Sequence, residues 1–456
     1  MQTLVLSDVH LGNASGLDIY AGADVLPAVI DRYAGPDTRI FFNGDTVDFL
    51  MNEDPLVLDV GRAVANARAI AAAPASAAVF SALGRAVQAG AEVILRLGNH
   101  DVELALPEVQ AVFRAALGVS ETHAARLIFQ LGTEPALLDI GGARVLLSHG
   151  EQNDDWNKVD YAGLLQPPEG GALPGFDYPP GTRLVKTIMN PLKRAYGLRF
   201  ADLLKPDFQG AVLALLAVAP EAVQEVFKGS TLTLLWQLFR QSRGPLTFGP
   251  AAEPAEPDLG LFDLVDEADL SDDEWAAVLA QLGDGPLSFA TNDSAATAFE
   301  KLGRKGLQAY ARFHRHVTGA ASERYFSLTP TEAEQQEVLR LAGKFNADAV
   351  ILGHTHAARF SQERSVVFVN TGTWITLMAL PDPDASLEVW ADFLALLQDN
   401  PGLDPARGPC APVVVRLTGA LLEPASGGGA QVRLIQFHDA SREEVLAEAV
   451  VRRSAG

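Results

Sequence analysis

The chain has 456 residues, 48% of them hydrophobic, so it can bury a large core, and its length suggests two or three domain-sized units. Its formal net charge of -22, from 57 acidic against 35 basic residues, disfavours binding to nucleic acid or to anionic membranes. The single cysteine, Cys410, excludes an intrachain disulfide. Because neither a signal pattern nor a membrane-spanning apolar stretch is found, we expect a cytoplasmic protein.

Short apolar runs alternate with helical patterns in the first part of the chain, residues 1–157. The helical patterns lie at 61–73 and at about 76–90, and Gly141-Gly142 indicates a hairpin between two of the runs. Together they predict the first part of a strand-rich core. The runs predicted as strands are TLVL (3–6), RIFF (39–42), EVILRL (92–97), ALLDI (136–140) and ARVLL (143–147).

Residues 158–328 have a different pattern, with a loop at 167–183 and then helical patterns from 185–197 onward. We predict a helical insertion, or cap, that interrupts the core and selects the substrate. Its acidic run at 253–274 is interpreted as a solvated loop. Its apolar segments form either the insertion's own core or a slot for a lipid or aryl group.

The basic side chains of the insertion allow two interpretations. They lie on solvated helix faces, or a few of them reach over the site and neutralise a charged substrate. These residues are Arg183, Lys186, Lys193, Arg194, Arg199, Lys301, Arg304, Lys305, Arg312 and Arg315.

The strand pattern resumes at residue 329, and residues 329–456 complete the core. Thr329, Pro330 and Glu332 predict a capped helix that begins there and runs to about Phe345. The strands predicted after it are AVIL (349–352), 365–372, and an antiparallel pair at 412–424 and 430–439 around the glycine-rich turn at 426–429.

Five of the predicted strands end in residues that can bind a metal ion or move a proton. Five of the nine histidines lie at these ends. Because ligands bind beyond the carboxyl ends of parallel strands, we expect the five ends to meet at one edge. Carboxylate, imidazole and amide groups together favour divalent ions such as Mn, Fe or Zn. The five runs are Ser7-Asp8-Val9-His10, Asn43-Gly44-Asp45, Gly98-Asn99-His100-Asp101, Ser148-His149-Gly150 and Gly353-His354-Thr355-His356.

Spacing within these runs adds detail. Asp8 with His10, and His354 with His356, stand two residues apart, so an extended backbone would point both members of each pair to one side. Asp45 has two carboxylate oxygens and is suited to bridge two ions. Any one run alone has the alternative interpretation of a turn. Five in order, each after an apolar strand, favour a shared site.

This ordered set resembles the calcineurin-like metallophosphoesterase superfamily, whose blocks run D-x-H, G-D-x-x-D, G-N-H-[DE], H-x or H-G, and G-H-x-H. The match covers residues 1–157 and about 330–376, including NTGTW at 370–374. The resemblance implies an α/β (α+β) fold, a two-sheet β-sandwich flanked by helices, with two divalent metal ions at one edge. The implied ligands are Asp8, His10, Asp45 and His356 for the first ion, and Asp45, Asn99, His149 and His354 for the second.

The resemblance also implies that His100 is catalytic, that Asp48 orients it, and that Asn99 and His100 contact the substrate. We therefore expect an enzyme that hydrolyses a phosphoester, mono- or diester, by attack of a hydroxide that the two ions activate. The expected substrate is a phosphorylated molecule of small or medium size. Asp101 either ties the loop backbone or supports a ligand.

Three alternatives stay open. One is a non-catalytic metal-binding interaction module of the same fold, another is a lipid-phosphate or pyrophosphate hydrolase, and the third is a nuclease, which the acidic charge disfavours. Phe49 and Leu50 stand where the protein Ser/Thr phosphatases of the superfamily carry Arg-Gly. His100 stands where the lipid A precursor pyrophosphohydrolases carry Arg. The first departure argues against the protein Ser/Thr phosphatases, and the second argues against the lipid A precursor pyrophosphohydrolases.

Overall fold

The computed structural model describes residues 1–203, Val218 and 327–453, apart from Glu53, Pro174, Ala379, Pro383 and Asp384. Between 204 and 326, the structure describes Val218 alone. The helical segments and the acidic run predicted there therefore lie outside the described residues. The chain forms two compact units. The first comprises Met1–Lys186, Phe326–Thr376 and Val415–Gly456, and the second comprises Thr187–Tyr325 and Leu377–Val414. The division predicted at 157 and 328 stays a prediction.

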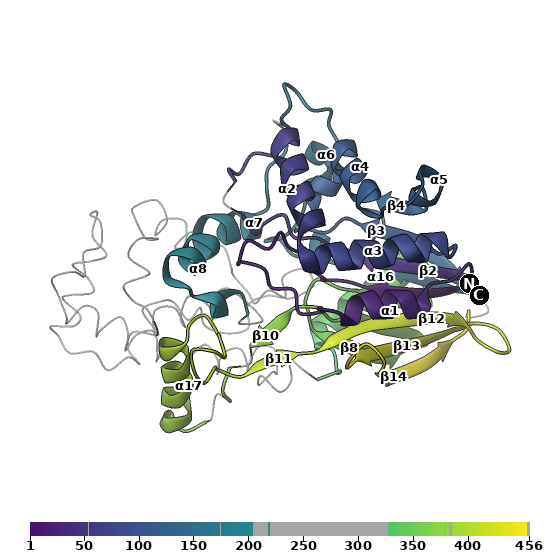
Figure 1. Cartoon of the computed structure of the whole chain (residues 1–456). Coiled ribbons are helices and arrows are strands. Elements are labelled where there is room, and N and C mark those ends of the chain that lie inside the picture. Colours follow the sequence, from purple (N-terminus) through teal and green to yellow (C-terminus); the bar gives the residue numbers. More distant parts are fainter. Residues whose placement is uncertain are drawn as a thin grey trace, which may run out of the picture. The chain divides into compact units, whose positions relative to one another are not determined.

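Within the described residues, the first unit is built on two β-sheets (Figure 1). In the larger, β1 to β4 are parallel, and β12 adds to β1 in the antiparallel direction, followed by β13 and β14. Its seven strands, in spatial order, are β14 (Glu443–Val451), β13 (Ala430–Phe437), β12 (Leu417–Pro424), β1 (Gln2–Leu6), β2 (Thr38–Asn43), β3 (Glu92–Arg96) and β4 (Leu127–Gln130).

The smaller sheet has five strands among the residues described. Its central strands β6, β7 and β9 are parallel. β5 and β6 form the predicted hairpin, with Gly141 and Gly142 at φ 62° and 91° in the turn. In spatial order the strands are β5 (Ala136–Ile140), β6 (Ala143–Leu147), β7 (Ala349–Leu352), β9 (Val366–Thr371) and β8 (Ala358–Glu363).

Alternation along the strands places one apolar face against helices and the other against the second sheet. In β1, Leu4 and Leu6 pack with the helices, whereas Val5 packs with Val145 and Ile351 of the smaller sheet. The helices on the first face are α1 (Val25–Tyr33), α2 (Val60–Ala72), α3 (Pro74–Gln88), α4 (Pro107–Ala116) and the short α5 (Glu121–Ala124) (Figure 1). The predicted sandwich flanked by helices is therefore confirmed.

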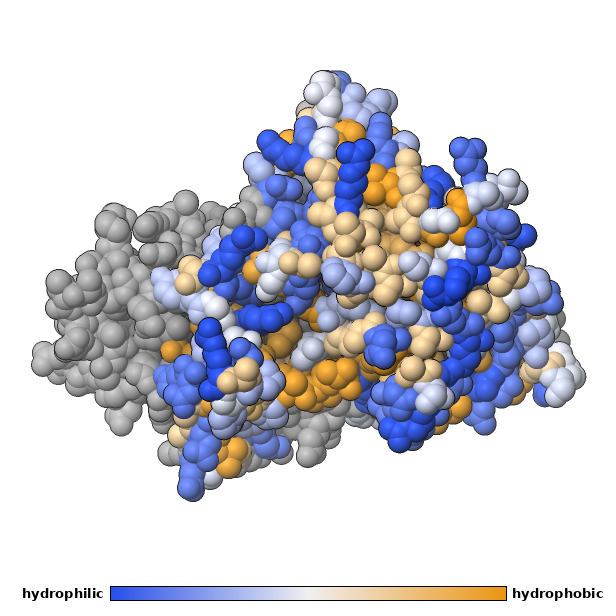
Figure 2. All heavy atoms as spheres, in the orientation of Figure 1, coloured by the Kyte–Doolittle hydropathy of each residue, from blue (hydrophilic) through white to orange (hydrophobic). Residues whose placement is uncertain are grey.

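Local signals explain where these helices begin. The Asp59 side chain accepts a hydrogen bond from Arg62 N at the start of α2, and α3 and α4 each begin with a proline. On their outer side, α2 and α3 expose alanines, and Figure 2 shows a largely tan surface there, between blue hydrophilic regions. No single helix among those described is long and apolar enough to cross a membrane.

The helix after residue 329 begins later than predicted. α16 (Glu332–Phe345) packs on the smaller sheet, and its cap is Thr331, whose side chain accepts from Glu334 N while the Glu334 side chain accepts from Thr331 N. The sequence TPTEAE holds two overlapping capping boxes, and the second forms. The prediction of Thr329 as the cap is wrong by two residues. Glu334 also pairs with Arg359 of β8 (3.3 Å), which favours the later start.

Shorter elements complete the first unit. They are η1 (Val102–Ala105), η2 (Glu151–Asn153), α6 (Tyr161–Leu164) and α7 (Pro180–Leu184). A π-helical turn, Val185–Met189, follows α7.

In the second unit, the described residues include α8 (Asn190–Tyr196), η4 (Arg199–Asp202) and α17 (Leu387–Asp399), with most of the strand pair β10 (Thr376–Met378) and β11 (Val413–Val415). The helical pattern predicted at 185–197 is confirmed by the π-helical turn and α8, which ends at Gly197 with φ 67°. The strand predicted at 412–424 is divided into β11 and β12.

Candidate metal centre

Five loops meet where strands of the two sheets end. The ends of β1, β2 and β3 come from the larger sheet, and those of β6 and β7 from the smaller one. The prediction that these ends meet is confirmed, although they belong to two sheets. The loops carry Asp8 and His10, Asp45 and Asp48, Asn99 and His100, His149, and His354 and His356, in that order of strands.

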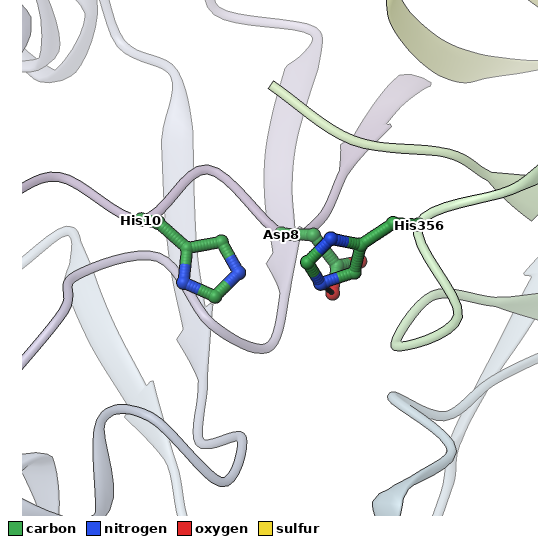
Figure 3. Close-up of side chains that lie close together, drawn as sticks. All are labelled: Asp8, His10 and His356. Atoms are coloured by element: carbon green, nitrogen blue, oxygen red, sulfur yellow. Dashed lines mark ion pairs between the residues drawn. The ribbon is translucent and has the colours of Figure 1, made fainter. Parts of the chain in front are cut away.

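One cluster joins the β1 loop to the β7 loop. Potential ligand atoms of Asp8, His10 and His356 lie within 4.8 Å of one another. Nε2 of His356 is 3.3 Å from Oδ1 of Asp8, and the rings of His10 and His356 are 5.2 Å apart at their centroids. Figure 3 shows the three side chains converging from the two loops. All three are buried.

A second cluster joins the loops after β2, β6 and β7. Potential ligand atoms of Asp45, His149 and His354 also lie within 4.8 Å of one another. Oδ2 of Asp45 is 3.3 Å from Nε2 of His149, and the same oxygen is 3.9 Å from Nε2 of His10 in the first cluster. One carboxylate oxygen of Asp45 therefore lies between the two clusters.

The ligand loops are turned, not extended. Asp8, His10, Asp45, His354 and His356 have φ values of 52°, 56°, 52°, 68° and 61°. The prediction that an extended backbone aligns the two spaced pairs is therefore wrong. Each chain must leave its strand and turn back, and left-handed residues make that turn. Asp and His tolerate this conformation better than most residues, yet it costs roughly 1–3 kcal/mol per residue.

Two glycines allow the loops to approach each other closely. A Cβ on Gly44, which has φ 96°, would lie 2.3 Å from the His149 ring. A Cβ on Gly353 would lie 2.5 Å from Ser7 Oγ and 2.8 Å from Asp8 Oδ2. Larger residues would displace a ligand in each case. Gly44 and Gly353 therefore allow the close approach of His149 and Asp8.

Hydrogen bonds fix the tautomers of two imidazoles. Nδ1 of His149 lies 2.8 Å from Asn43 O, and Nδ1 of His10 lies 3.1 Å from Asp48 Oδ2. A carbonyl or carboxylate oxygen only accepts, so each Nδ1 donates, and in the neutral ring each Nε2 carries the lone pair.

The buried atoms without a hydrogen-bond partner in the described structure include Asp8 Oδ1, His10 Nε2, Asn99 Oδ1 and His149 Nε2. These atoms come from the ligand loops, and all of them can donate electron pairs to a cation. Unsatisfied buried polar atoms are rare in folded proteins because they lose their hydration. The donor set therefore fits divalent metal ions.

The electrostatics of the site favour positive charge. Burial alone would raise the pKa of Asp8 and Asp45, but the nearby imidazoles, His356 and His149 first among them, lower the pKa of both carboxyls below the ordinary value. Burial acts to lower the pKa of His149, yet Asp45 and Asp8 raise it to about 10. The ionised carboxylates supply the negative charge that raises the pKa of His149, and the same negative charge would favour a bound cation.

His100 lies at the accessible edge of the site. Its side chain is 17% exposed, whereas those of His10 and His149 are 0% exposed. Nδ1 of His100 is 3.3 Å from Asp48 Oδ1, and the other oxygen of Asp48 contacts His10. Burial acts to raise the pKa of Asp48, but His100 and His10 outweigh it and hold that pKa below its ordinary value.

Asp101 holds two loops together. Its Oδ1 accepts a hydrogen bond from Gly98 N (2.6 Å) and its Oδ2 accepts one from Thr46 N (2.8 Å). Both carboxylate oxygens are thus occupied by backbone N–H groups of the β2 and β3 loops. Of the two roles considered for Asp101, the geometry favours tying the loop backbone.

Residues 370–374 brace the first cluster. Trp374 N and Thr373 Oγ1 each donate to the backbone oxygen of Asp8 at 3.0 Å, and Asn370 Nδ2 donates to Gly353 O at 2.8 Å. The NTGTW run therefore supports ligand loops from both sheets.

One residue at the site was not predicted from the sequence. Asp154, just beyond η2, places Oδ2 3.0 Å from Nε2 of His354. Its run, Asn153-Asp154-Asp155-Trp156-Asn157, follows His149 closely, and this local density of polar groups is the only sequence signal that pointed to it.

The basic residues predicted on the insertion fall into different environments. Arg194 and Arg199 are exposed, as solvated helix faces require, whereas Lys186 and Lys193 are buried. Arg183 pairs with Asp177 at 3.0 Å. The solvated interpretation is therefore wrong for two of the five. The others, Lys301, Arg304, Lys305, Arg312 and Arg315, lie outside the described residues.

Lys186 faces a hollow of about 260 Å³, partly open to solvent, that it lines together with Glu103, Tyr178, Arg62 and Phe49. The Tyr178 hydroxyl donates to Glu103 Oε1 at 2.8 Å. Burial raises the pKa of the Glu103 carboxyl to about 7, and burial lowers the pKa of the Lys186 amine. Burial therefore disfavours the charged form of both side chains.

Neither a family model nor a curated protein matches the chain. Among solved structures, the chain is similar to a predicted phosphoesterase from Streptococcus pneumoniae TIGR4, at 10% identity and TM-score 0.25, over 98% of this chain and 96% of that one. It is also similar to a dimetal phosphatase from Danio rerio, at 12% identity and TM-score 0.29, over 100% and 99%. TM-scores this low carry no weight for fold or function.

The family likeness therefore depends on the chain's own residues. The five blocks occur in the family's order, and their side chains gather in the clusters described above. In the order of its motifs and in the place where they meet, the chain is similar to the calcineurin-like metallophosphoesterases.

Proposed function

We propose that the chain is a dinuclear metal-dependent phosphohydrolase that cleaves a phosphoester of small or medium size. The observation that carries the proposal is the position of Asp45, whose Oδ2 lies 3.3 Å from His149 and 3.9 Å from His10, between the two carboxylate and imidazole clusters. The proposed metals are divalent Mn, Fe or Zn, and the cytoplasm is the proposed compartment.

Asp8, His10, Asp45 and His356 would hold one ion, and Asp45, Asn99, His149 and His354 the other. The unpartnered buried atoms of Asp8, His10, Asn99 and His149 support this assignment. Two bound divalent cations would supply Lewis acidity toward the phosphoryl oxygens and toward a water nucleophile.

His100 would act on the leaving group. Its Nδ1 faces Asp48 Oδ1 at 3.3 Å, so Nε2 is the nitrogen that would carry a proton to the departing oxygen. Asp48 would fix the ring orientation of His100 and of His10 at once, since each of its oxygens meets one of the two rings. Asn99 and His100 are also proposed to contact the substrate.

The test is hydrolysis of a chromogenic aryl phosphate and an aryl phosphodiester by the full chain with added manganese, against the same protein with a chelator. We expect turnover that depends on the metal and that His100→Ala suppresses while both ions remain bound. Two bound ions without turnover on a broad panel of mononucleotides, cyclic nucleotides, aryl diesters and lipid pyrophosphates would instead support the non-catalytic metal-binding module.

A further inference from the structure

We propose that Asp154 and Asn157 are positioning residues for the second cation, acting through its ligands His354 and Asn99. The inference rests on the two-cation site proposed above. It concerns a loop that lies outside the five strand-end motifs, and it assigns to that loop control over one of the two ions.

Asp154 acts on His354. Its Oδ2 is 3.0 Å from Nε2 of the imidazole. Because a carboxylate only accepts, the neutral ring donates from Nε2, and the lone pair is then on Nδ1. Metal-bound histidines generally donate their other ring N–H to a carboxylate or carbonyl in this way, which orients the ring and raises its basicity. His354 thereby matches His10 and His149, whose second nitrogens are also engaged.

Asn157 acts on Asn99. Its Nδ2 donates to Asp154 Oδ2 at 2.7 Å, and its Oδ1 accepts from Asn99 Nδ2 at 3.4 Å. The amide nitrogen of Asn99 is thus directed to Asn157, and its buried Oδ1, which has no hydrogen-bond partner, is directed away from it. An amide binds a metal through its oxygen, so this orientation is the one that ligation needs.

The two contacts form one chain, His354–Asp154–Asn157–Asn99. A single short loop therefore orients ligands that come from two different sheets. The side chains of Asp154 and Asn157 contact His354 and Asn99 and, within the described residues, none of Asp8, His10 and His356, so the loop should affect one ion selectively.

The loop is itself held by the start of α7. Asp154 Oδ1 accepts from Trp156 N at 2.9 Å, and Gly181 N donates to Trp156 O at 2.8 Å. A Cβ on Gly181 would lie 2.3 Å from Asn157 Oδ1. The backbone of α7 thus approaches Asn157 so closely that only glycine fits, and a change there should be transmitted to Asn99.

The experiment is a manganese titration of metal-free full-length protein, followed by calorimetry and by electron paramagnetic resonance. Asp154→Ala should weaken the second site about 10- to 100-fold and leave the first within about twofold, the range typical for loss of such outer contacts. Asp155→Ala, which removes the same charge from the adjacent exposed residue, should leave both sites unchanged.

Resonance spectra separate positioning from general structural damage. At manganese concentrations that fill both wild-type sites, Asp154→Ala should show a single-ion spectrum in place of a spin-coupled pair, with the thermal midpoint of the metal-free protein unchanged. Asp154→Asn, which keeps an acceptor for His354, should recover part of the affinity.

Gly181→Ala should weaken the second site without removing any polar group, whereas Gly175→Ala, whose Cβ would meet nothing within 4 Å, should not. Wild-type affinity at both sites in Asp154→Ala, or equal weakening of both, would overturn the inference. Two manganese sites without phosphoester turnover, together with a selective loss in Asp154→Ala, would overturn the proposed function and keep the inference. A wild-type protein that binds fewer than two ions would overturn both.

Discussion

His100→Ala separates catalysis from metal binding more cleanly than any other substitution at the site. The side chain is 17% exposed and contacts Asp48 at 3.3 Å, with its ring edge-on to His10 at 4.5 Å between centroids. The contact that positions Asp45 comes instead from the backbone N–H of residue 100, which donates to Asp45 Oδ1 at 2.9 Å. That bond survives the substitution.

The expected effect on turnover is large. If His100 delivers a proton to the leaving oxygen, its removal should lower kcat about 100- to 10,000-fold, or roughly 3–5 kcal/mol of transition-state stabilisation. Both ions should remain, because Asp48 still holds His10 at 3.1 Å and neither proposed ligand set includes His100. Elemental analysis of the purified variant checks the ions, and steady-state kinetics with manganese checks the turnover.

Comparing two leaving groups tests whether His100 delivers a proton. An acidic phenol departs without a proton, so the loss in His100→Ala should be small for its phosphoester and much greater for an alkyl phosphoester. His123→Ala is a matched control, because the imidazole of that histidine in α5 contacts the Ser120 hydroxyl at 2.9 Å, away from the clusters. Equal losses for both leaving groups would refute proton delivery, and a wild-type rate on the alkyl ester with two ions bound would refute any catalytic role for His100.

Asp45→Asn should lower the manganese content from two ions to one or none, because it removes the charge from the oxygen between the clusters; elemental analysis that finds two ions would contradict the bridging assignment. Gly353→Ala should weaken the first ion by displacing Asp8, whereas Gly343→Ala in α16, where a Cβ meets nothing within 4 Å, should not; calorimetry compares the two. Glu103 has a folded-state pKa of about 7 against an ordinary 4.5, so its contribution to stability is complete below pH 4.5 and is lost as the pH rises through 7, by at most about 3 kcal/mol. Glu103→Gln keeps an acceptor for Tyr178 and should therefore be more stable than the wild type above pH 7, with a difference that shrinks toward pH 5 in urea unfolding; a difference independent of pH would contradict the raised pKa. Supercoiled DNA should stay intact with the wild-type protein and manganese, since the net charge of -22 repels polyanions, and conversion to the nicked form would revive the nuclease alternative.

The sequence was most informative where chemistry and local pattern coincide. Apolar runs predicted β1, β2, β3, β6 and β7, and the polar residues after each run predicted where they meet. Strands β4, β8, β10 and β14 and helices α1, α4 and α17 were not predicted. Pairing over long distances explains part of this: β1 pairs with β12, more than 400 residues later, and no local signal encodes that register.

The environments of some charged residues were also not predicted from the sequence. Lys186 was considered as part of a solvated helix face or as a substrate contact, but it is buried beside Glu103 and Tyr178. A lysine in a helical pattern is usually exposed, and only the tertiary arrangement shows that its stem and amine are covered. Asp154 was missed for a related reason, since a polar run in a loop is usually solvated and its partner His354 lies 200 residues away.

The ligand loops show most clearly why residue types were easier to predict than backbone geometry. A spacing of two fits an extended strand, but it equally fits a left-handed turn, and the choice depends on what the backbone of Asp8 can bond to. Its N–H donates to Gly44 O at 3.2 Å, and its carbonyl accepts from Trp374 N and Thr373 Oγ1 at 3.0 Å. These partners come from the β2 loop and from the segment after β9, so the φ of 52° at Asp8 is set by both sheets together. The backbone strain at Asp8 thus depends on the same meeting of the two sheets that brings the clusters together. It could not be predicted from the sequence, because it depends on how the sheets pair.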